Sequence, residues 1–138
     1  MRPRGGLVAE GAYGVSDRAT YVDTYAAGFD RSLKRLGPAA AAQVAAELQS
    51  FLRAWRRGDS AMELNRSWTF KAIQGEEAKR WKVMQIYVLR DYRVLLIDVA
   101  ESTPPCIWFL EVFRKTSKNA EYIKRAVERA RAIREAQR

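Results

Sequence analysis

The sequence predicts an α+β fold with an N-terminal strand and helical hairpin, a mainly antiparallel twisted sheet of about four to five strands, and a C-terminal helix. Three observations support this prediction. The 138 residues are 48% hydrophobic, which suits one globular core. Apolar residues recur at helical spacing near both ends of the chain. Between these regions lie four strand-like segments separated by polar or Gly/Pro breaks.

The first eighteen residues differ in composition from the rest of the chain. They carry four glycines and no apolar period, so they offer too little apolar surface to offset the entropy of ordering. We therefore expect residues 1–18 to form a flexible N-terminal extension and residues 19–138 to form a single domain. The β-branched and aromatic segment TYVDTYA, from Thr20, predicts the first strand.

A helical hairpin should follow this strand. The segment FDRSLKRLGP places Phe29, Leu33 and Leu36 at helical spacing and ends in Gly37 and Pro38, which break the helix. Pro38 also suits the first turn of a second helix, predicted to run to about residue 57. The apolar stripe of this helix contains Val44, Leu48, Phe51 or Leu52, and Trp55.

After a polar loop, the pattern changes to strands. The four predicted strands are SWTFKAI, WKVMQIYVL, YRVLLIDVA and CIWFLEVF. Arg90 and Asp91 separate the second and third closely enough for a hairpin, whereas residues 102–105 make a more open connection. Consecutive strands should therefore be antiparallel. The last segment, from Asn119 as N-cap, predicts a helix with an apolar stripe and a largely solvated basic face.

The charge of the chain indicates a polyanionic or acidic partner. Lys and Arg total 25 against 16 Asp and Glu, giving a formal net charge of +9 and a pI near 10.1. An excess of this size on a small domain favours nucleic acid or an acidic protein over a merely soluble basic surface.

Several chemistries are excluded by composition. The chain has no histidine and one cysteine, Cys106, so His-based catalysis, an internal disulfide and a multi-cysteine zinc site are excluded. We expect no cofactor and no metal, and we expect Cys106 to be a small core residue. Apolar runs are too short for a membrane span and no signal-like segment opens the chain, so we expect a cytoplasmic protein.

Three stretches resemble a known family. They are WTFKAIQG, DYRVLLI and FLEVFRKTSKNAEYIKRAVERA, the last being similar to an F-x-K-K-T-x-K-x-P helix-entry motif. Together with the element order, they resemble the RelE/HigB superfamily of bacterial type II toxins, in its phage-derived Gp49-like branch, over residues 20–133. The chain departs from that motif at Arg114, which replaces its first lysine, and at Ala120, which replaces its proline.

The resemblance implies a toxin that cuts mRNA on the ribosome, inhibits translation and is silenced by a cognate antitoxin, with which it can form a hetero-oligomer. In a metal-independent endoribonuclease, the RNA 2′-hydroxyl attacks the adjacent phosphate, a step that needs a proton acceptor, charge stabilisation and a proton donor. The expected catalytic residues are Arg93, Lys115, Arg114, Lys82 and Tyr122. We expect Arg93 and Lys115, with Arg114 and Lys82 nearby, to clamp the scissile phosphate on the open face of the sheet. The expected RNA-binding residues are Lys71, Tyr92, Lys118 and Lys124.

Alternatives stay open at each of these positions. Arg93 suits an ordinary strand-surface cation, and Tyr87, Tyr92 and Tyr122 suit packing as well as base stacking. Glu111, inside an apolar strand, suits a base with a raised pKa or, preferably, a partner for a buried cation. The alternative functions are a ParE-like inhibitor of DNA gyrase and a non-catalytic RNA-binding module or decayed toxin.

Overall fold

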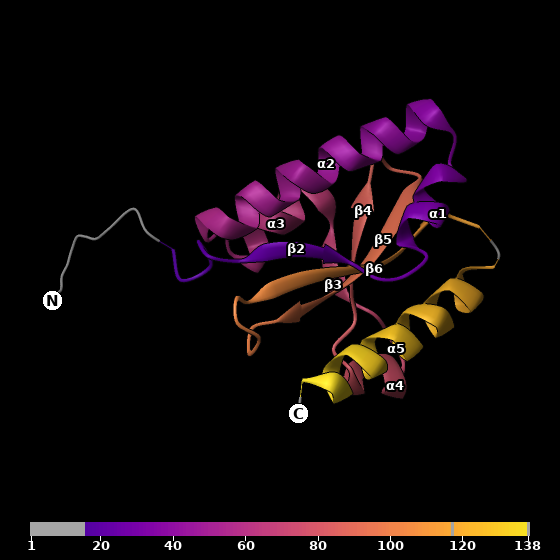
Figure 1. The fold of residues 1–138 in the computed structure, drawn as a ribbon. Coiled ribbons are helices and arrows are strands. Elements are labelled where there is room, and N and C mark those ends of the chain that lie inside the picture. The colour runs from indigo at the N-terminus through magenta and orange to yellow at the C-terminus, as the bar shows by residue number, and fades with distance from the viewer. Residues whose placement is uncertain (1–15, 117, 138) are drawn as a thin grey trace, which may run out of the picture.

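The computed structural model describes residues 16–116 and 118–137 and has an α+β architecture built on one mixed, five-stranded sheet (Figure 1). The strand order is β2-β6-β5-β4-β3. The strands are β2 (Val22–Tyr25), β3 (Phe70–Ala72), β4 (Met84–Val88), β5 (Tyr92–Val99) and β6 (Cys106–Arg114). β2 pairs with β6 in parallel and all other pairs are antiparallel. The predicted fold class is confirmed, and the arrangement is consistent with a RelE-like fold.

Helices cover both faces of this sheet (Figure 1). Their bounds are α1 (Phe29–Lys34), α2 (Pro38–Arg57), α3 (Ala61–Trp68), α4 (Glu76–Arg80) and α5 (Asn119–Ala136). α2 and α3 lie on one face, while α4 and α5 lie on the other. α1 packs beside the β6 side of the sheet. The predicted hairpin is therefore present, with Pro38 in the first turn of α2 and Gly58 closing that helix in a left-handed conformation.

Each face of the sheet carries its own apolar cluster. Alternation along β5 sends Val94 and Leu96 to the cluster under α2, and sends Leu95 and Ile97 to the cluster under α5. A bulge interrupts the pairing of β5 with β6 between Leu95 and Leu96. Because both faces of the sheet are covered, the sequence of β5 is a nearly continuous apolar run and does not alternate between apolar and polar residues.

The polar loop expected after the second helix and the break expected between the first two strands of the four-strand run each contain a short helix, so these two predictions were wrong. α3 begins with a capping box, in which the Ser60 hydroxyl accepts from the Glu63 N–H and the Glu63 carboxylate accepts from the Ser60 N–H. α4 follows Gly75 and carries Glu76 and Glu77 in its first turn. The strands on either side are consequently shorter than predicted, since Trp68 belongs to α3 and Trp81 closes α4.

Two further features concern the ends of the chain. Residues 1–15 of the expected extension lie outside the described range, but Arg18 is described and donates to the Asp59 carbonyl oxygen. Its guanidinium also lies 4.2 Å from the centre of the Trp55 ring. At the other end, α5 begins at Asn119, with Lys118 as its N-cap in place of the predicted Asn119. No helix within the described ranges is long and apolar enough to cross a membrane.

Candidate functional site

The sheet face that carries α4 and α5 brings together an aromatic residue and three cations near the β4–β5 turn. Tyr87 pairs with Arg93 across the β4–β5 ladder, and Arg93 pairs with Phe113 across the β5–β6 ladder. Lys71 pairs with Gln85 on β4. Gln85 lies two residues before Tyr87 on this strand, so both point to the same face of the sheet. Paired residues share a face, so Lys71, Tyr87 and Arg93 form a row across three strands.

The phenol of Tyr87 is electrostatically unusual. The Lys71 Nζ lies 4.9 Å from the centre of the Tyr87 ring, and the Arg93 guanidinium lies 3.6 Å from it. The pKa of Tyr87 is lowered from its ordinary value, chiefly by the neighbouring Lys71 ammonium, which favours the phenolate. Burial opposes this effect, and the positive charges of Arg93 and Lys115 add to it. The arrangement therefore produces a tyrosine that gives up its proton more readily than usual.

Other tyrosines show the opposite behaviour. Tyr21 donates to Asp98 at 2.6 Å, and burial together with that carboxylate raises its pKa. Tyr25 donates to Asp23 at 2.7 Å, and burial and this contact raise its pKa too. Both phenols are held in their protonated form by a carboxylate neighbour. Tyr87 is thus distinguished by its cationic surroundings.

Arg93 lies beneath this site and does not line an open phosphate clamp, which corrects the expected geometry. Its residue is only 7% exposed. Its Nη1 donates to the carbonyl oxygen of Arg90 at 2.7 Å and to that of Tyr92 at 3.1 Å. Because one face of the guanidinium stacks on Tyr87 and Nη1 is already engaged, Arg93 acts as a positioning residue that holds the ring and contributes positive charge.

The two basic residues at the end of β6 are separated by strand alternation. Lys115 is exposed, and its positive charge contributes to the lowered pKa of Tyr87, so this charge lies on the same face of the sheet as the site. Its N–H donates to the Asp91 carbonyl at 2.7 Å, which fixes the backbone beside the β4–β5 turn. Arg114 pairs with Tyr92, and Tyr92 is the residue next to Arg93 on β5. Because successive side chains of a strand point to opposite faces, Arg114 and Tyr92 point to the α2 face of the sheet. The expectation that Arg114 lies beside Arg93 in the phosphate clamp is therefore wrong.

Lys82 also lies away from the cluster. It precedes β4 at the end where Met84 pairs with Leu96, five residues before Tyr87. A strand rises about 3.3 Å per residue, so the separation along the chain is roughly 16 Å. Lys82 instead borders a cavity shared with Glu101 and Arg134 at the opposite end of the sheet. Its expected proximity to the phosphate clamp is corrected.

Tyr122 borders the site from the first turn of α5. Its ring stacks on Phe113 with the ring centres 4.4 Å apart and the planes 5° from parallel. The Arg125 guanidinium lies 4.8 Å from the centre of the same ring. Since Phe113 is the β6 neighbour of Arg93, Tyr122 closes one side of the row through packing.

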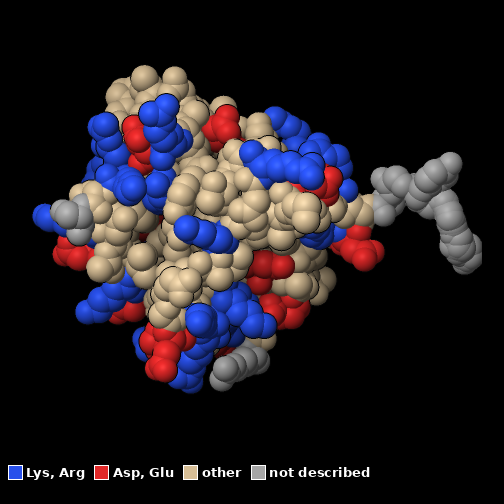
Figure 2. Space-filling view, turned by 180° about the vertical axis from the view of Figure 1, so that it is seen from behind, with Lys and Arg blue, Asp and Glu red and all other residues tan. Residues whose placement is uncertain are grey.

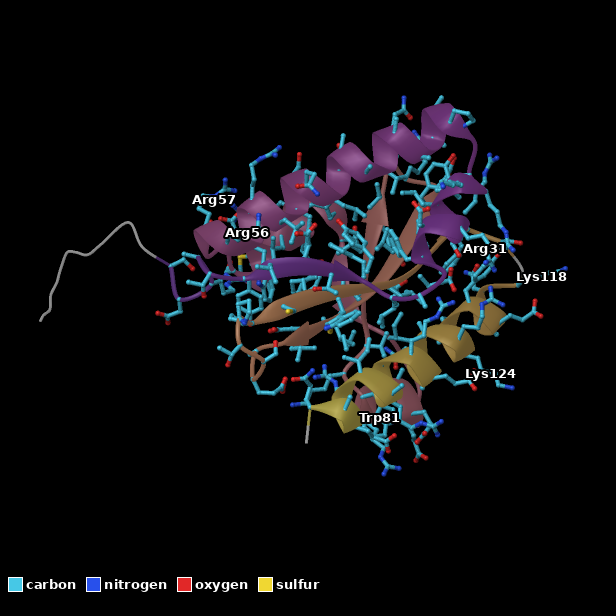
Figure 3. The ribbon with its side chains drawn as sticks, in the orientation of Figure 1. Arg31, Arg56, Arg57, Trp81, Lys118 and Lys124 are labelled. Carbon is cyan, nitrogen blue, oxygen red and sulfur yellow. The ribbon has the colours of Figure 1, made fainter. Side chains whose placement is uncertain are left out.

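The remaining predicted RNA-binding residues lie on α5 or just before it. Lys118 is exposed at the beginning of the helix, at the same end of the molecule as Arg31, and Lys124 points away from the sheet (Figure 3). Lys124 lines a groove of about 530 Å³ that also includes Trp81 from the end of α4. These two lysines extend the basic surface without joining the Tyr87 row.

Glu111 is a partner for cations, as the preferred interpretation of the sequence expected. It is fully buried and accepts from Ser32 Oγ at 2.5 Å, Arg125 Nε at 3.3 Å and Arg129 Nη1 at 2.8 Å. The helix α5 therefore presents Arg125 and Arg129 toward the sheet, as well as Arg134, which donates to the Trp81 and Asp98 carbonyls. The expectation of a largely solvated basic face on α5 is wrong for Arg129 and Arg134, whereas the Arg125 side chain is 45% exposed.

The importance of Tyr87 was missed at the level of sequence. Tyr87 was considered only as a stacking or structural tyrosine, although the short β4–β5 turn already indicated which residues lie opposite each other. With Arg90 and Asp91 in the turn, Tyr87 and Arg93 pair directly. No sequence signal placed Lys71 beside them, because its register depends on where β3 begins after the unpredicted helix α3.

Comparison with known proteins adds no assignment, since no protein-family model, curated protein or solved structure matches this chain. Geometry and charge therefore distinguish the site. Figure 2 shows that Lys and Arg side chains on one face form separate groups divided by uncharged surface. Within the described part of the chain, no three Asp, Glu or Cys side chains gather where they could hold a metal ion.

Proposed function

We propose that this protein is a metal-independent endoribonuclease that acts as the toxin of a type II toxin–antitoxin system, cutting ribosome-bound mRNA. The observation that carries the proposal is the Tyr87 phenol, whose pKa is lowered among Lys71, Arg93 and Lys115. Such a group supplies a proton acceptor beside two exposed ammonium groups, which are the functions that RNA cleavage through the 2′-hydroxyl requires.

The proposed reaction is a transesterification within the RNA. The Tyr87 phenolate accepts the proton of the 2′-hydroxyl, and the 2′-oxygen forms a bond to the adjacent phosphorus. The bond from phosphorus to the 5′-oxygen breaks, and the Lys115 ammonium donates a proton to that leaving oxygen. The products are a 2′,3′-cyclic phosphate and a 5′-hydroxyl. Lys71 and Lys115 stabilise the additional negative charge on the phosphorane.

Arg93 supports this reaction indirectly. Its guanidinium stacks 3.6 Å from the Tyr87 ring centre and its Nη1 is fixed by two carbonyl oxygens. It therefore orients the phenol and helps to keep its pKa low. Preorganisation of this kind removes the need to rearrange charges during the reaction.

The ribosome, the mRNA and a cognate antitoxin are the partners that this function implies. The net charge of +9 favours association with RNA at physiological salt. An acidic antitoxin segment would neutralise the same basic surface and so block access to the site. A protein target such as DNA gyrase would use the surface charges but would have no need for a phenol with a lowered pKa.

The proposal is tested by primer extension on an mRNA in a reconstituted translation reaction. Wild-type protein is compared with Tyr87→Phe, which removes only the hydroxyl and retains the ring that packs on Arg93. Arg53→Ala, an exposed cation on α2, serves as the control. Cuts that disappear in Tyr87→Phe and persist in Arg53→Ala support the proposal. Intact mRNA with the wild-type protein, despite growth arrest in cells, contradicts it and favours a protein target.

A further inference from the structure

We propose that four arginines between α1 and α5 form a second phosphate-binding site, which holds the backbone of the RNA strand a few nucleotides from Tyr87. This inference rests on the proposed ribonuclease function and extends its site. The arginines line a cavity of about 210 Å³ and come from two helices far apart in the sequence. They are Arg31, Arg35, Arg125 and Arg129.

The cavity has an excess of positive charge. Four guanidinium groups face one carboxylate, that of Glu111, so three positive charges are not neutralised by the cavity lining. Glu111 binds Arg125 and Arg129, both on α5. Within the described residues, Arg31 and Arg35 form no ion pair with a carboxylate. A phosphodiester group in the cavity would offset one of these three charges.

The spacing of the arginines is unfavourable in the absence of an anion. Arg31 and Arg35 are four residues apart at α1, and Arg125 and Arg129 are four residues apart on α5. Residues at this spacing share one helix face, and like charges there destabilise the helix. The two pairs also line the same cavity, which adds to the repulsion. A bound phosphate converts this repulsion into charge-assisted hydrogen bonds.

The wall of the cavity is built to hold one of these guanidinium groups in place. Arg129 Nη1 donates to the Leu110 carbonyl at 2.7 Å and to Glu111 at 2.8 Å. A Cβ at Gly28 would lie 2.7 Å from Arg129 Nη2, so a larger residue here would displace the end of the Arg129 side chain. Gly28 also has a φ of 90°, which favours glycine for backbone reasons.

The cavity and the Tyr87 row share the same face of β6. Glu111 lies two residues before Phe113 on β6, and Phe113 is connected through Arg93 to Tyr87 on β4. From strand rise and strand spacing, the Cα atoms of Glu111 and Tyr87 are roughly 12 Å apart. One extended RNA strand can span this distance and contact both clusters. A phosphodiester chain, with a negative charge at every nucleotide, therefore fits the two clusters together.

The test measures RNA binding without cleavage. The probe is a short single-stranded RNA with 2′-O-methyl groups, which lacks the attacking hydroxyl, and fluorescence anisotropy reports its binding at several salt concentrations. Arg31→Ala/Arg35→Ala is compared with Lys34→Ala on the same helix, whose ammonium pairs with Asp30 in solvent. We expect the double variant to bind about tenfold more weakly. Its salt dependence should also fall by about 0.7 in the log–log slope, as for one lost phosphate contact.

Thermal unfolding at low salt provides a second readout and checks that the variants fold. If the arginine pairs serve to bind phosphate and do not stabilise the fold, the double variant should be at least as stable as the wild-type protein, because repulsion among the four arginines is reduced. Binding by the double variant equal to that of Lys34→Ala overturns the inference. If the wild-type protein cleaves ribosome-bound mRNA in that case, the proposed function still stands. Weakened binding in a protein that never cleaves RNA supports the arginine site and contradicts the nuclease. Absence of any binding of the free RNA by the wild-type protein overturns the arginine site, and cleavage of ribosome-bound mRNA then decides the proposed function separately.

Discussion

Replacing Arg129 by methionine should destabilise the protein strongly, because it leaves a buried carboxylate short of a partner. Glu111 is fully buried, and Arg129 is its closest cation at 2.8 Å. Removing one member of a buried ion pair costs about 3–5 kcal/mol. Arg125 remains at 3.3 Å, but its side chain is 45% exposed and therefore screened by solvent. Because this partial compensation remains, we expect the lower end, about 3 kcal/mol. For a chain of this size, that corresponds to a fall in Tm of about 10 °C.

The assay is urea unfolding followed by circular dichroism, together with thermal melting. Methionine preserves most of the apolar stem, so lost packing contributes little. Arg131→Met, an exposed arginine on the same helix, is the matched control and should change stability by less than about 0.5 kcal/mol. Adding Glu111→Gln to Arg129→Met removes the uncompensated charge and should recover part of the loss. A cost below about 1 kcal/mol for Arg129→Met alone would refute the electrostatic reasoning.

Three other predictions concern catalysis and folding. Lys71→Met removes the largest influence that lowers the pKa of Tyr87, so that pKa should rise. The cleavage rate should then begin to increase at a higher pH than in the wild-type protein. An unchanged pH–rate profile argues against Tyr87 as the base. Gly28→Ala should destabilise the protein in urea unfolding, because the alanine Cβ would contact Arg129 and the backbone φ at this position is positive. Unchanged stability would contradict this prediction. Ser60→Ala should lower the free energy of unfolding by about 1 kcal/mol in the same assay, because the α3 cap is lost. Ser67→Ala changes an exposed serine in the same helix and is the control. An equal loss of stability in the control would show that the effect does not come from capping.

Local patterns in the sequence predicted most of the fold. The Gly37–Pro38 break and the following apolar stripe located α2 between Pro38 and Arg57, because proline at the first turn and glycine after the last are strong local signals. The hairpin at Arg90 and Asp91 likewise gave the pairing of β4 with β5. These features depend on neighbouring residues alone, so a single sequence suffices to predict them.

The two short helices were missed for identifiable reasons. The capping box of α3 was present in the sequence as Ser60 and Glu63, three residues apart, and gave a usable signal. α4 has only five residues and its burial involves Ala78, so its stability depends on packing beneath α5. Tertiary packing of this kind leaves little trace in local periodicity.

The candidate site was only partly predictable. Lys71, Arg93 and Lys115 were identified from the residues and the family resemblance, but strand alternation separates Arg114 and Tyr92 from them. The start of β3 sets whether Lys71 shares a face with Tyr87, and this start could not be predicted from the sequence. The lowered pKa of Tyr87 arises from three residues on three segments, so it required the assembled sheet.

The most direct test of the central claim is the chemical identity of the RNA ends that this protein generates. Ribosome-bound mRNA is incubated with the wild-type protein in the presence of a divalent-metal chelator at a level that leaves ribosomes intact, and the fragments are analysed by mass spectrometry. The Tyr87 mechanism predicts 2′,3′-cyclic phosphate and 5′-hydroxyl ends, which Tyr87→Phe should reduce by at least a hundredfold. Fragments with 5′-phosphate ends, or cleavage that persists unchanged in Tyr87→Phe, would contradict it.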